Sequence, residues 1–105
     1  MHKYRTHTCS EITKKNSGTT VRLSGWIHRK RDHGNLLFFD LRDHFGLTQC
    51  VIENSNKFFK VVEKINPESV LCVLGEVVNR SPNTVNKDLF TGEVEIKVSS
   101  FEILS

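Results

Sequence analysis

The chain has 105 residues, which allows one globular domain with a single core and is too short for two. Hydrophobic residues make up 37% of the composition and charged residues 26%, as in an ordinary soluble domain, and no apolar run approaches the length of a membrane span. The N-terminus carries no hydrophobic signal core, so we expect a cytoplasmic protein. The formal charge of +3 is only mildly basic, which is compatible with a nucleic-acid partner without demonstrating one.

The three cysteines are too scattered for a disulfide framework or a structural zinc site. They are Cys9, Cys50 and Cys72, with no CxxC pair and an odd total. Cys50 and Cys72 lie within apolar runs, where cysteine usually behaves as a small buried hydrophobe. A reducing compartment is the simplest interpretation.

Residues 1–18 form a polar N-terminal segment that ends in the turn signal KKNSG, and residues 19–105 are expected to form the folded body. The first strand is predicted over residues 20–31, where apolar and polar residues alternate from Val21. Gly25 interrupts this alternation, as a bulge or a sharp bend would.

The second strand, predicted over residues 36–43, has two clearly different faces. Its odd-numbered positions up to 41 are apolar, whereas its even-numbered positions include the charged residues Asp40 and Arg42. Since alternate side chains of a strand point to opposite faces, the even-numbered face is the solvated one. Phe38 is therefore expected to be an aromatic ring on a solvent-facing sheet surface.

The rest of the chain alternates between strand and helix signals. A third strand is predicted over residues 47–53, with Gln49 on the odd-numbered face, and a short helix over residues 56–65, where apolar residues recur at helical spacing. Residues 69–80 are almost continuously hydrophobic, which indicates a strand buried on both faces. After a polar loop, residues 93–104 alternate cleanly, with Val94, Ile96 and Val98 inward and Glu93, Glu95 and Lys97 outward.

Three strands, a helix and two further strands predict an all-β OB-fold, a five-stranded barrel with one short helix between strands 3 and 4 and an N-terminal extension. Strands 2 and 3 of this fold face oligonucleotides. A β-sandwich is the competing architecture, but it offers no natural position for a lone helix.

Several side chains on one predicted sheet face suit single-stranded nucleic acid. OB-folds of this kind combine a cationic groove with aromatic rings on which bases stack. Arg29 and Arg31 close the first strand, and Phe38 lies on the wet face of the second. The amide of Gln49 can donate to and accept from a base edge, and Glu95 is a plausible acceptor for guanine-like donors.

Each of these residues also has a purely structural explanation. The Arg29–Arg31 run is usually a solvated turn, Phe38 could be covered by the N-terminal segment, and Gln49 could simply bond across strands. Glu95 lies in the charge pattern of an ordinary solvated strand. Their convergence on one face favours the binding interpretation.

The chain carries no recognisable catalytic constellation. Its five histidines lack metal-ligand spacing, and it contains neither a glycine-rich phosphate loop nor a nucleophile motif. Asp40 and Asp43, with Arg42 between them, are expected to form a salt-bridged strand end. No catalytic residue, metal or cofactor is therefore predicted for this chain.

Two long blocks of the sequence resemble one enzyme family. GWIHRKRDHGNLLFFDLRDHFGLTQCV is similar to the start of bacterial-type aspartyl-tRNA synthetases, with the pattern GWVxRRRDxGxxxFxDLRDxxGxxQVV. VLCVLGEVVNRSPNTVNKDLFTGEVEI resembles the family's second block, which ends in a TGExE element, and RTHTC fits its opening. The resemblance spans nearly the whole chain and implies an N-terminal anticodon-binding domain.

The resemblance implies roles for individual residues in tRNA binding. Phe38 matches the phenylalanine that stacks on the central anticodon uridine, and Gln49 matches the glutamine that contacts this base. Glu95, the second glutamate of TGExE, matches the residue that reads the first anticodon base.

Further matches and departures surround these three positions. Arg29 and Arg31 match arginines near the anticodon bases and phosphates, and Asn86 matches a neighbouring loop asparagine. Lys30 replaces the middle arginine, a substitution that suits a phosphate contact better than a bidentate one. His33 occupies a variable position where histidine is associated with relaxed discrimination between aspartate and asparagine anticodons, so we expect both tRNAs as candidate partners.

The resemblance also implies a larger parent enzyme. A synthetase of this family needs a class II catalytic domain, which uses ATP and Mg and is absent from this chain, and it is expected to be a homodimer. We therefore expect a tRNA-binding fragment without its own catalysis. A free-standing OB-fold protein for single-stranded nucleic acid and a protein-interaction module remain the alternatives.

Overall fold

The computed structural model describes residues 5–104; residues 1–4 of the N-terminal segment and Ser105 lie outside the described part. Five strands account for nearly half of the described chain, with one α-helix and two short 3-10 helices among the connecting segments. In chain order they are η1 (Lys14–Asn16), β1 (Thr20–Asp32), β2 (Leu36–Arg42), β3 (Leu47–Glu53), α1 (Phe59–Lys64), β4 (Val70–Asn79), η2 (Pro82–Thr84) and β5 (Val94–Ile103).

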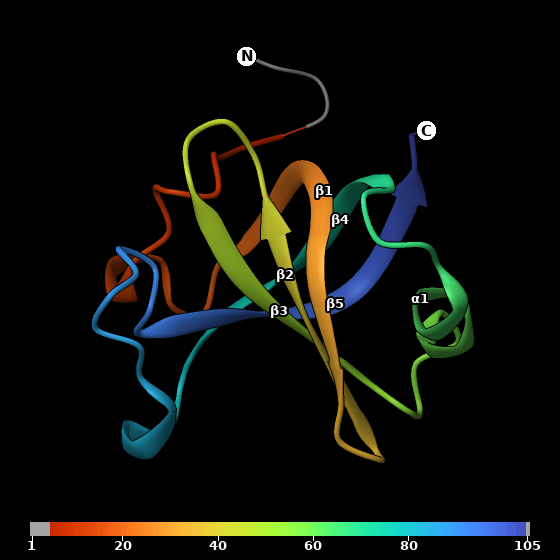
Figure 1. Ribbon diagram of the computed structural model, residues 1–105. Helices are drawn as coiled ribbons and strands as arrows, with labels where there is room; N and C mark the ends of the chain where they lie inside the picture. The colour runs from red at the N-terminus through yellow and green to blue at the C-terminus, as the bar shows by residue number, and fades with distance from the viewer. Residues whose placement is uncertain (1–4, 105) are drawn as a thin grey trace.

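The strands close into a barrel in the order β1–β2–β3–β5–β4 (Figure 1). The long strand β1 pairs with β4 through Thr20–Trp26 and with β2 from Trp26 onward, and a short parallel pairing of β3 with β5 completes the closure. This confirms the predicted five-stranded OB-fold with a helix between strands 3 and 4. The β-sandwich alternative is excluded, because a sandwich has two separate sheets.

Gly25 does not carry the bulge that we expected there. The register of β1 against β2 shifts between Ile27 and Arg29 instead. Gly25 lies where β1 passes from β4 to β2, and a Cβ atom at this position would overlap the carbonyl oxygen of Arg42. The glycine is therefore required for the close approach of two backbones.

The alternation of β2 and β5 builds the barrel core as predicted. The odd-numbered residues of β2 from Leu37 to Leu41 are buried, and Phe39 is the largest fully buried side chain. Val94, Ile96 and Val98 of β5 point into the same core. Cys9, Cys50 and Cys72 are buried free thiols, which confirms the expectation for the last two.

The helix is shorter than predicted, and one of its expected core residues is wrong. Val61 is 45% exposed, whereas Phe59, which the pattern did not single out, is buried together with Val62. Phe58 and Ile65 pack only partly against the core. A helix of six residues has a narrow buried face, so a one-residue error in phase exposes a predicted core position.

Strand β4 is also less buried than its hydrophobic run suggests. Leu71, Cys72 and Val73 are buried, but Glu76 is exposed and Val78 is half-buried. In a closed barrel only the inner face of a strand meets the core, so buried residues on the outer face need cover from another segment.

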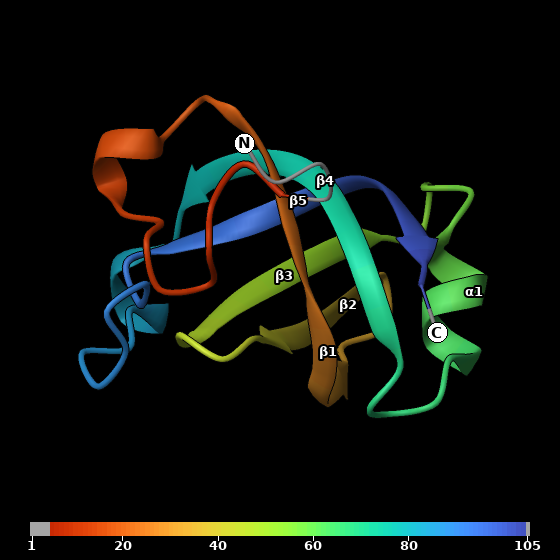
Figure 2. The ribbon, with the colours of Figure 1, turned by 90° about the horizontal axis from the view of Figure 1, so that it is seen from above.

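The N-terminal segment packs against the barrel and contributes to its core. Cys9 and Ile12 are fully buried, and the hydroxyl of Thr48 donates to the carbonyl of Cys9 at 2.7 Å. The backbone N–H of Thr6 donates to the carbonyl of Arg22 on β1. Figures 1 and 2 show η1 and α1 on opposite sides of the barrel. Phe38 lines an open pocket, so residues 5–18 do not cover it.

Candidate nucleic-acid interface

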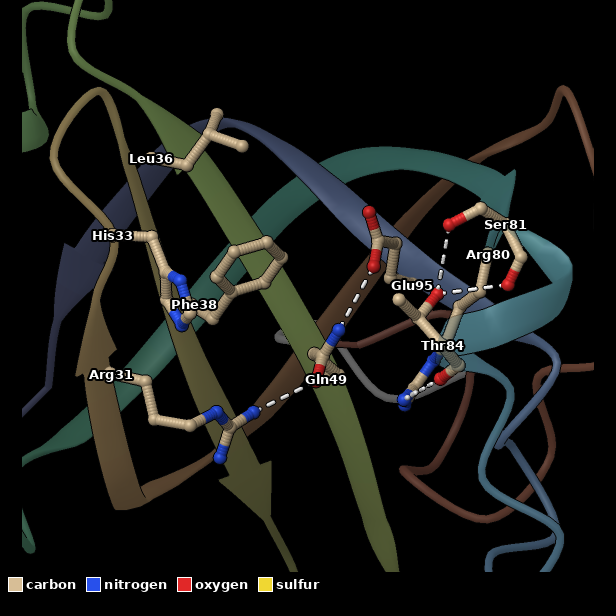
Figure 3. Close-up of a pocket in the computed structure, with 9 residues that line it drawn as sticks. All are labelled: Arg31, His33, Leu36, Phe38, Gln49, Arg80, Ser81, Thr84 and Glu95. Carbon is tan, nitrogen blue, oxygen red and sulfur yellow. Dashed lines mark hydrogen bonds between the residues drawn. The ribbon is translucent and has the colours of Figure 1, made fainter.

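A pocket of about 380 Å³ opens on the barrel face formed by β1, β2, β3 and β5 (Figure 3). Its lining combines cationic, carboxylate, amide and hydroxyl groups with an aromatic ring. The lining residues are Arg31, His33, Leu36, Phe38, Gln49, Arg80, Ser81, Thr84 and Glu95.

Phe38 stands in this pocket as a half-buried ring on the solvated face of β2. His33, from the turn between β1 and β2, meets it edge to face, with ring centroids 5.2 Å apart and an interplanar angle of 86°. The turn is tight: the N–H of Gly34, which has a φ of 76°, donates to the carboxylate of Asp32. Strand register places Phe38 opposite Arg31, so a cation and a ring share one level of the sheet.

Four polar side chains form a continuous chain of hydrogen bonds across four strands. The Arg31 guanidinium on β1 donates to both carboxylate oxygens of Asp40 on β2, at 3.1 and 3.2 Å. It also donates to Oε1 of Gln49 on β3 at 2.8 Å. Nε2 of Gln49 in turn donates to Oε1 of Glu95 on β5 at 2.9 Å. Figure 3 shows the Arg31–Gln49–Glu95 part of this chain.

Strand pairing explains why these residues meet. Asp40 is the register partner of Gln49 in the β2–β3 pair. Gln49 and Glu95 each precede one member of the parallel Cys50–Ile96 pair, so they lie at the same level. The Gln49 side chain is only 9% exposed, and it lies between a cation and a carboxylate. Such an amide has one favourable orientation, with its oxygen toward the cation.

The expected ion pairs around Arg42 are wrong. Asp40 pairs with Arg31, whereas Asp43 accepts backbone N–H bonds from its own turn and from Cys9. The Nε atom of Arg42 is buried and has no hydrogen-bond partner. Side-chain reach decides these pairs, since Arg31 lies diagonally across the strands from Asp40 and sequence adjacency does not bring groups together in a sheet.

Arg80 is a pocket residue that we did not predict from the sequence. It is 9% exposed, its Nε donates to the carbonyl of Val94 and its Nη1 to the carbonyl of Thr84, while Nη2 is buried without a partner. Burial lowers the pKa of this guanidinium. The arginine thus ties η2 to β5 beside Glu95. The sequence signal that could have pointed to Arg80 was a charged residue directly after a hydrophobic strand.

The structure does not bring Lys30 to the pocket. Its ammonium group donates to the carbonyls of Val62, Glu63 and Ile65 at the C-terminal end of α1. Since successive strand residues point to opposite faces, Lys30 lies on the face away from Arg31. Lys30 therefore helps to hold the helix, and its expected role in nucleic-acid binding stays a prediction.

Arg29 and Asn86 also lie outside the pocket lining. Arg29 is exposed on β1 and is the register partner of Asp40, so it lies near the network without belonging to it. Asn86 organises its own loop: its carboxamide oxygen accepts the N–H of Asp88, and its backbone N–H donates to the carbonyl of Gly92. Both residues remain candidates for contact with a ligand larger than the pocket.

Metal ligation and thiol reactivity can each be assessed among the described residues. Among residues 5–104 no group of three or more histidine, cysteine or acidic side chains is arranged to hold a metal ion. Burial raises the pKa of the Cys9 thiol, and the neighbouring Asp43 carboxylate raises it further; burial also raises the pKa of Cys50. These thiols are neutral and inert near neutral pH. The pocket is suited to binding.

The family model described as an OB-fold nucleic acid binding domain, with the name tRNA_anti-codon, matches residues 21–104. This chain belongs to that family. The match covers every residue that lines the pocket and all five strands except Thr20, the first residue of β1. None of the helices described between residues 5 and 104 is long and apolar enough to cross a bilayer.

Two curated relatives carry the same enzyme name. The chain is 59% identical over 104 residues to the aspartate–tRNA(Asp/Asn) ligase of Pelagibacter ubique, and 57% identical over 105 residues to the ligase of that name from Phenylobacterium zucineum. It spans only 18% of the length of each of these relatives. Among solved structures, it is similar to asparaginyl-tRNA synthetase from Pyrococcus horikoshii, with a TM-score of 0.79 and 27% identity over 94% of this chain and 23% of that one.

Proposed function

We propose that this chain is the N-terminal anticodon-binding domain of an aspartyl-tRNA synthetase and that the pocket around Phe38 binds the anticodon loop. The observation that carries the proposal is that the half-buried Phe38 ring lines one pocket together with the Arg31, Gln49 and Glu95 side chains. The family match and the names of the relatives support it. The parent enzyme would attach aspartate to tRNA with ATP and Mg, through a class II catalytic domain that these residues do not include, as a homodimer in the cytoplasm.

Binding in this proposal combines stacking with selective hydrogen bonds. The central anticodon base stacks on Phe38, which supplies about 1–3 kcal/mol and tolerates any base. Gln49 contacts the edge of the stacked base, and Glu95 accepts from the first anticodon base. Arg29 and Arg31 act near the anticodon bases and phosphates, and Asn86 contacts the loop beside them.

Relaxed choice between two tRNAs is a further part of the proposal. Aspartate and asparagine anticodons differ at the third base, and we propose that His33 tolerates both. His33 contacts Phe38 edge to face, so a base stacked on the ring lies next to the imidazole. The relatives named above as aspartate–tRNA(Asp/Asn) ligases are consistent with this assignment.

The proposal is tested by titrating the 105-residue chain with anticodon stem-loops. A GUC loop and a GUU loop should bind with affinities within about threefold of each other, because the third base is not discriminated, while a scrambled loop should bind at least tenfold more weakly. Equal binding of all loops, with a steep dependence on salt, would instead indicate a sequence-tolerant single-strand binder. No binding at all would favour a protein-interaction module. A GUC preference over GUU of tenfold or more would refute the role of His33 alone.

A further inference from the structure

We propose that Asp40 is a positioning residue for base discrimination: it holds Arg31 so that the Gln49 amide keeps one orientation and prefers uracil over cytosine on Phe38. The inference rests on the proposed function and goes beyond it, because Asp40 does not line the pocket. The observation that supports this inference is the hydrogen-bond network Asp40–Arg31–Gln49–Glu95.

The carboxylate of Asp40 is turned toward Arg31 rather than toward a ligand. Its side chain is only 14% exposed, and both of its oxygens accept from the guanidinium. An available carboxylate on a surface that receives RNA would repel phosphates. Asp40 therefore acts through the arginine that it binds.

The bidentate pair determines which way Arg31 faces. A guanidinium that meets a carboxylate with two parallel hydrogen bonds is fixed in plane and direction. Nη2 of Arg31 then has its remaining hydrogen directed at Oε1 of Gln49, 2.8 Å away. Without Asp40, the long arginine side chain is free to turn toward solvent or phosphate.

The direction of Arg31 sets the polarity of Gln49. Oε1 accepts from the cation and Nε2 donates to Glu95, so each amide atom retains one further hydrogen-bonding site. A base in the pocket therefore meets three groups in order: a donor from the remaining N–H groups of Arg31, the acceptor Oε1 of Gln49 and the donor Nε2 of Gln49. This pattern complements the acceptor, donor, acceptor edge of uracil.

The reversed amide would select a different base. With the oxygen and nitrogen of Gln49 exchanged, the presented sequence becomes donor, donor, acceptor, which complements the Watson–Crick edge of cytosine. The reversed state also places an NH₂ group against the Arg31 guanidinium and an oxygen against the Glu95 carboxylate, so the native network excludes it. Asp40 thus contributes to specificity while leaving the stacking surface intact.

The first test compares anticodon stem-loops that carry uracil or cytosine as the middle base. In Asp40→Asn, the preference for uracil should fall by about tenfold, the usual scale of one well-placed pair of base contacts. Overall affinity need not fall, since a negative charge is lost from an RNA-binding surface. Glu53→Gln is the matched control: it removes a carboxylate from β3 that pairs with Lys97 outside the pocket, and should leave the ratio unchanged.

The second test needs no RNA, which separates this inference from the proposed function. The side-chain amide signals of Gln49, assigned by their loss in Gln49→Leu, should move toward free-glutamine positions in Asp40→Asn and stay in place in Glu53→Gln. Unchanged signals, or an unchanged ratio between uracil and cytosine in a folded Asp40→Asn variant, would overturn the inference. If Asp40→Asn does not fold, Asp40→Ser serves for the same two measurements. Absence of RNA binding by the unmodified chain would instead count against the proposed function.

Discussion

At the scale of single residues, Phe38 and Phe39 lie on opposite faces of β2. Phe39 is fully buried, whereas Phe38 lines the pocket and contacts His33 at its edge. Leaving an apolar ring in contact with water forgoes the stabilisation that burial would provide. A base that stacks on the ring recovers this contribution at the moment of binding.

Replacing Phe38 with alanine should weaken binding of a GUC stem-loop by about 5- to 150-fold, because stacking contributes about 1–3 kcal/mol. Fluorescence anisotropy of a labelled stem-loop measures the change. Phe45→Ala is the control, since Phe45 is a 60% exposed aromatic residue in the β2–β3 turn and does not line the pocket. An affinity that is the same in both variants would contradict the stacking assignment.

At the scale of elements, strand β1 contributes both to the pocket and to the attachment of α1. On one face of β1, Arg31 enters the pocket network, while on the other face Lys30 binds three carbonyls at the end of α1. The helix has six residues and no side-chain hydrogen bond at its N-cap, so it depends on outside contacts. A cation at the C-terminal end of a helix also interacts favourably with the helix dipole.

Lys30→Met should therefore lower the free energy of unfolding by about 1–2 kcal/mol while leaving stem-loop affinity within about twofold of the original. Urea denaturation and anisotropy measure the two quantities. Lys60→Met removes an equal charge from an exposed position on α1 itself and should change stability by less than about 0.5 kcal/mol. A larger loss of RNA affinity in the Lys30 variant than in the Lys60 variant would indicate that Lys30 takes part in RNA binding.

The elements were more predictable from the sequence than the side-chain partners. Period-two alternation located the core residues of β2 and β5, because in a barrel with one buried side the pattern is dictated by burial. The helix phase was wrong at Val61, since one and a half turns carry too few residues to define a face. The alternation along β1 also predicts that Lys30 and Arg31 point to opposite faces of the strand. We instead interpreted residues 29–31 as one basic cluster.

The pocket itself could be predicted only in part. Arg31, Phe38, Gln49 and Glu95 lie on one face as expected, because strand parity decides it. Strand parity could not place Arg80 in the pocket, since its position follows from how the loop after β4 returns to β5. The charge at the end of the hydrophobic run marks the residue but not its partners. The same limit explains the diagonal pairing of Arg31 with Asp40.

At the scale of the whole molecule, the N-terminal segment belongs to the folded unit. Ile12 is fully buried in the same core cluster as the barrel strands, and η1 follows it with a capping box between Thr13 and Asn16. The backbone N–H of Cys9 donates to the Asp43 carboxylate, and the Arg5 guanidinium lies over the Phe45 ring. These contacts attach the segment to β1 and to the β2–β3 turn, away from the residues that line the pocket.

Truncating Ile12 to alanine should consequently destabilise the chain by about 2–5 kcal/mol, the range for opening a cavity in a packed core. The preference for a GUC loop over a scrambled loop should persist under conditions where the variant is folded, because Ile12 does not line the pocket. Ile103→Ala is the control: this residue is 50% exposed, and the same truncation there should cost less than about 1 kcal/mol. If the two variants unfolded at the same urea concentration, the N-terminal segment would not contribute to the stability of the core. A large difference in midpoint together with an unchanged loop preference would establish that the N-terminal segment stabilises the fold without taking part in recognition.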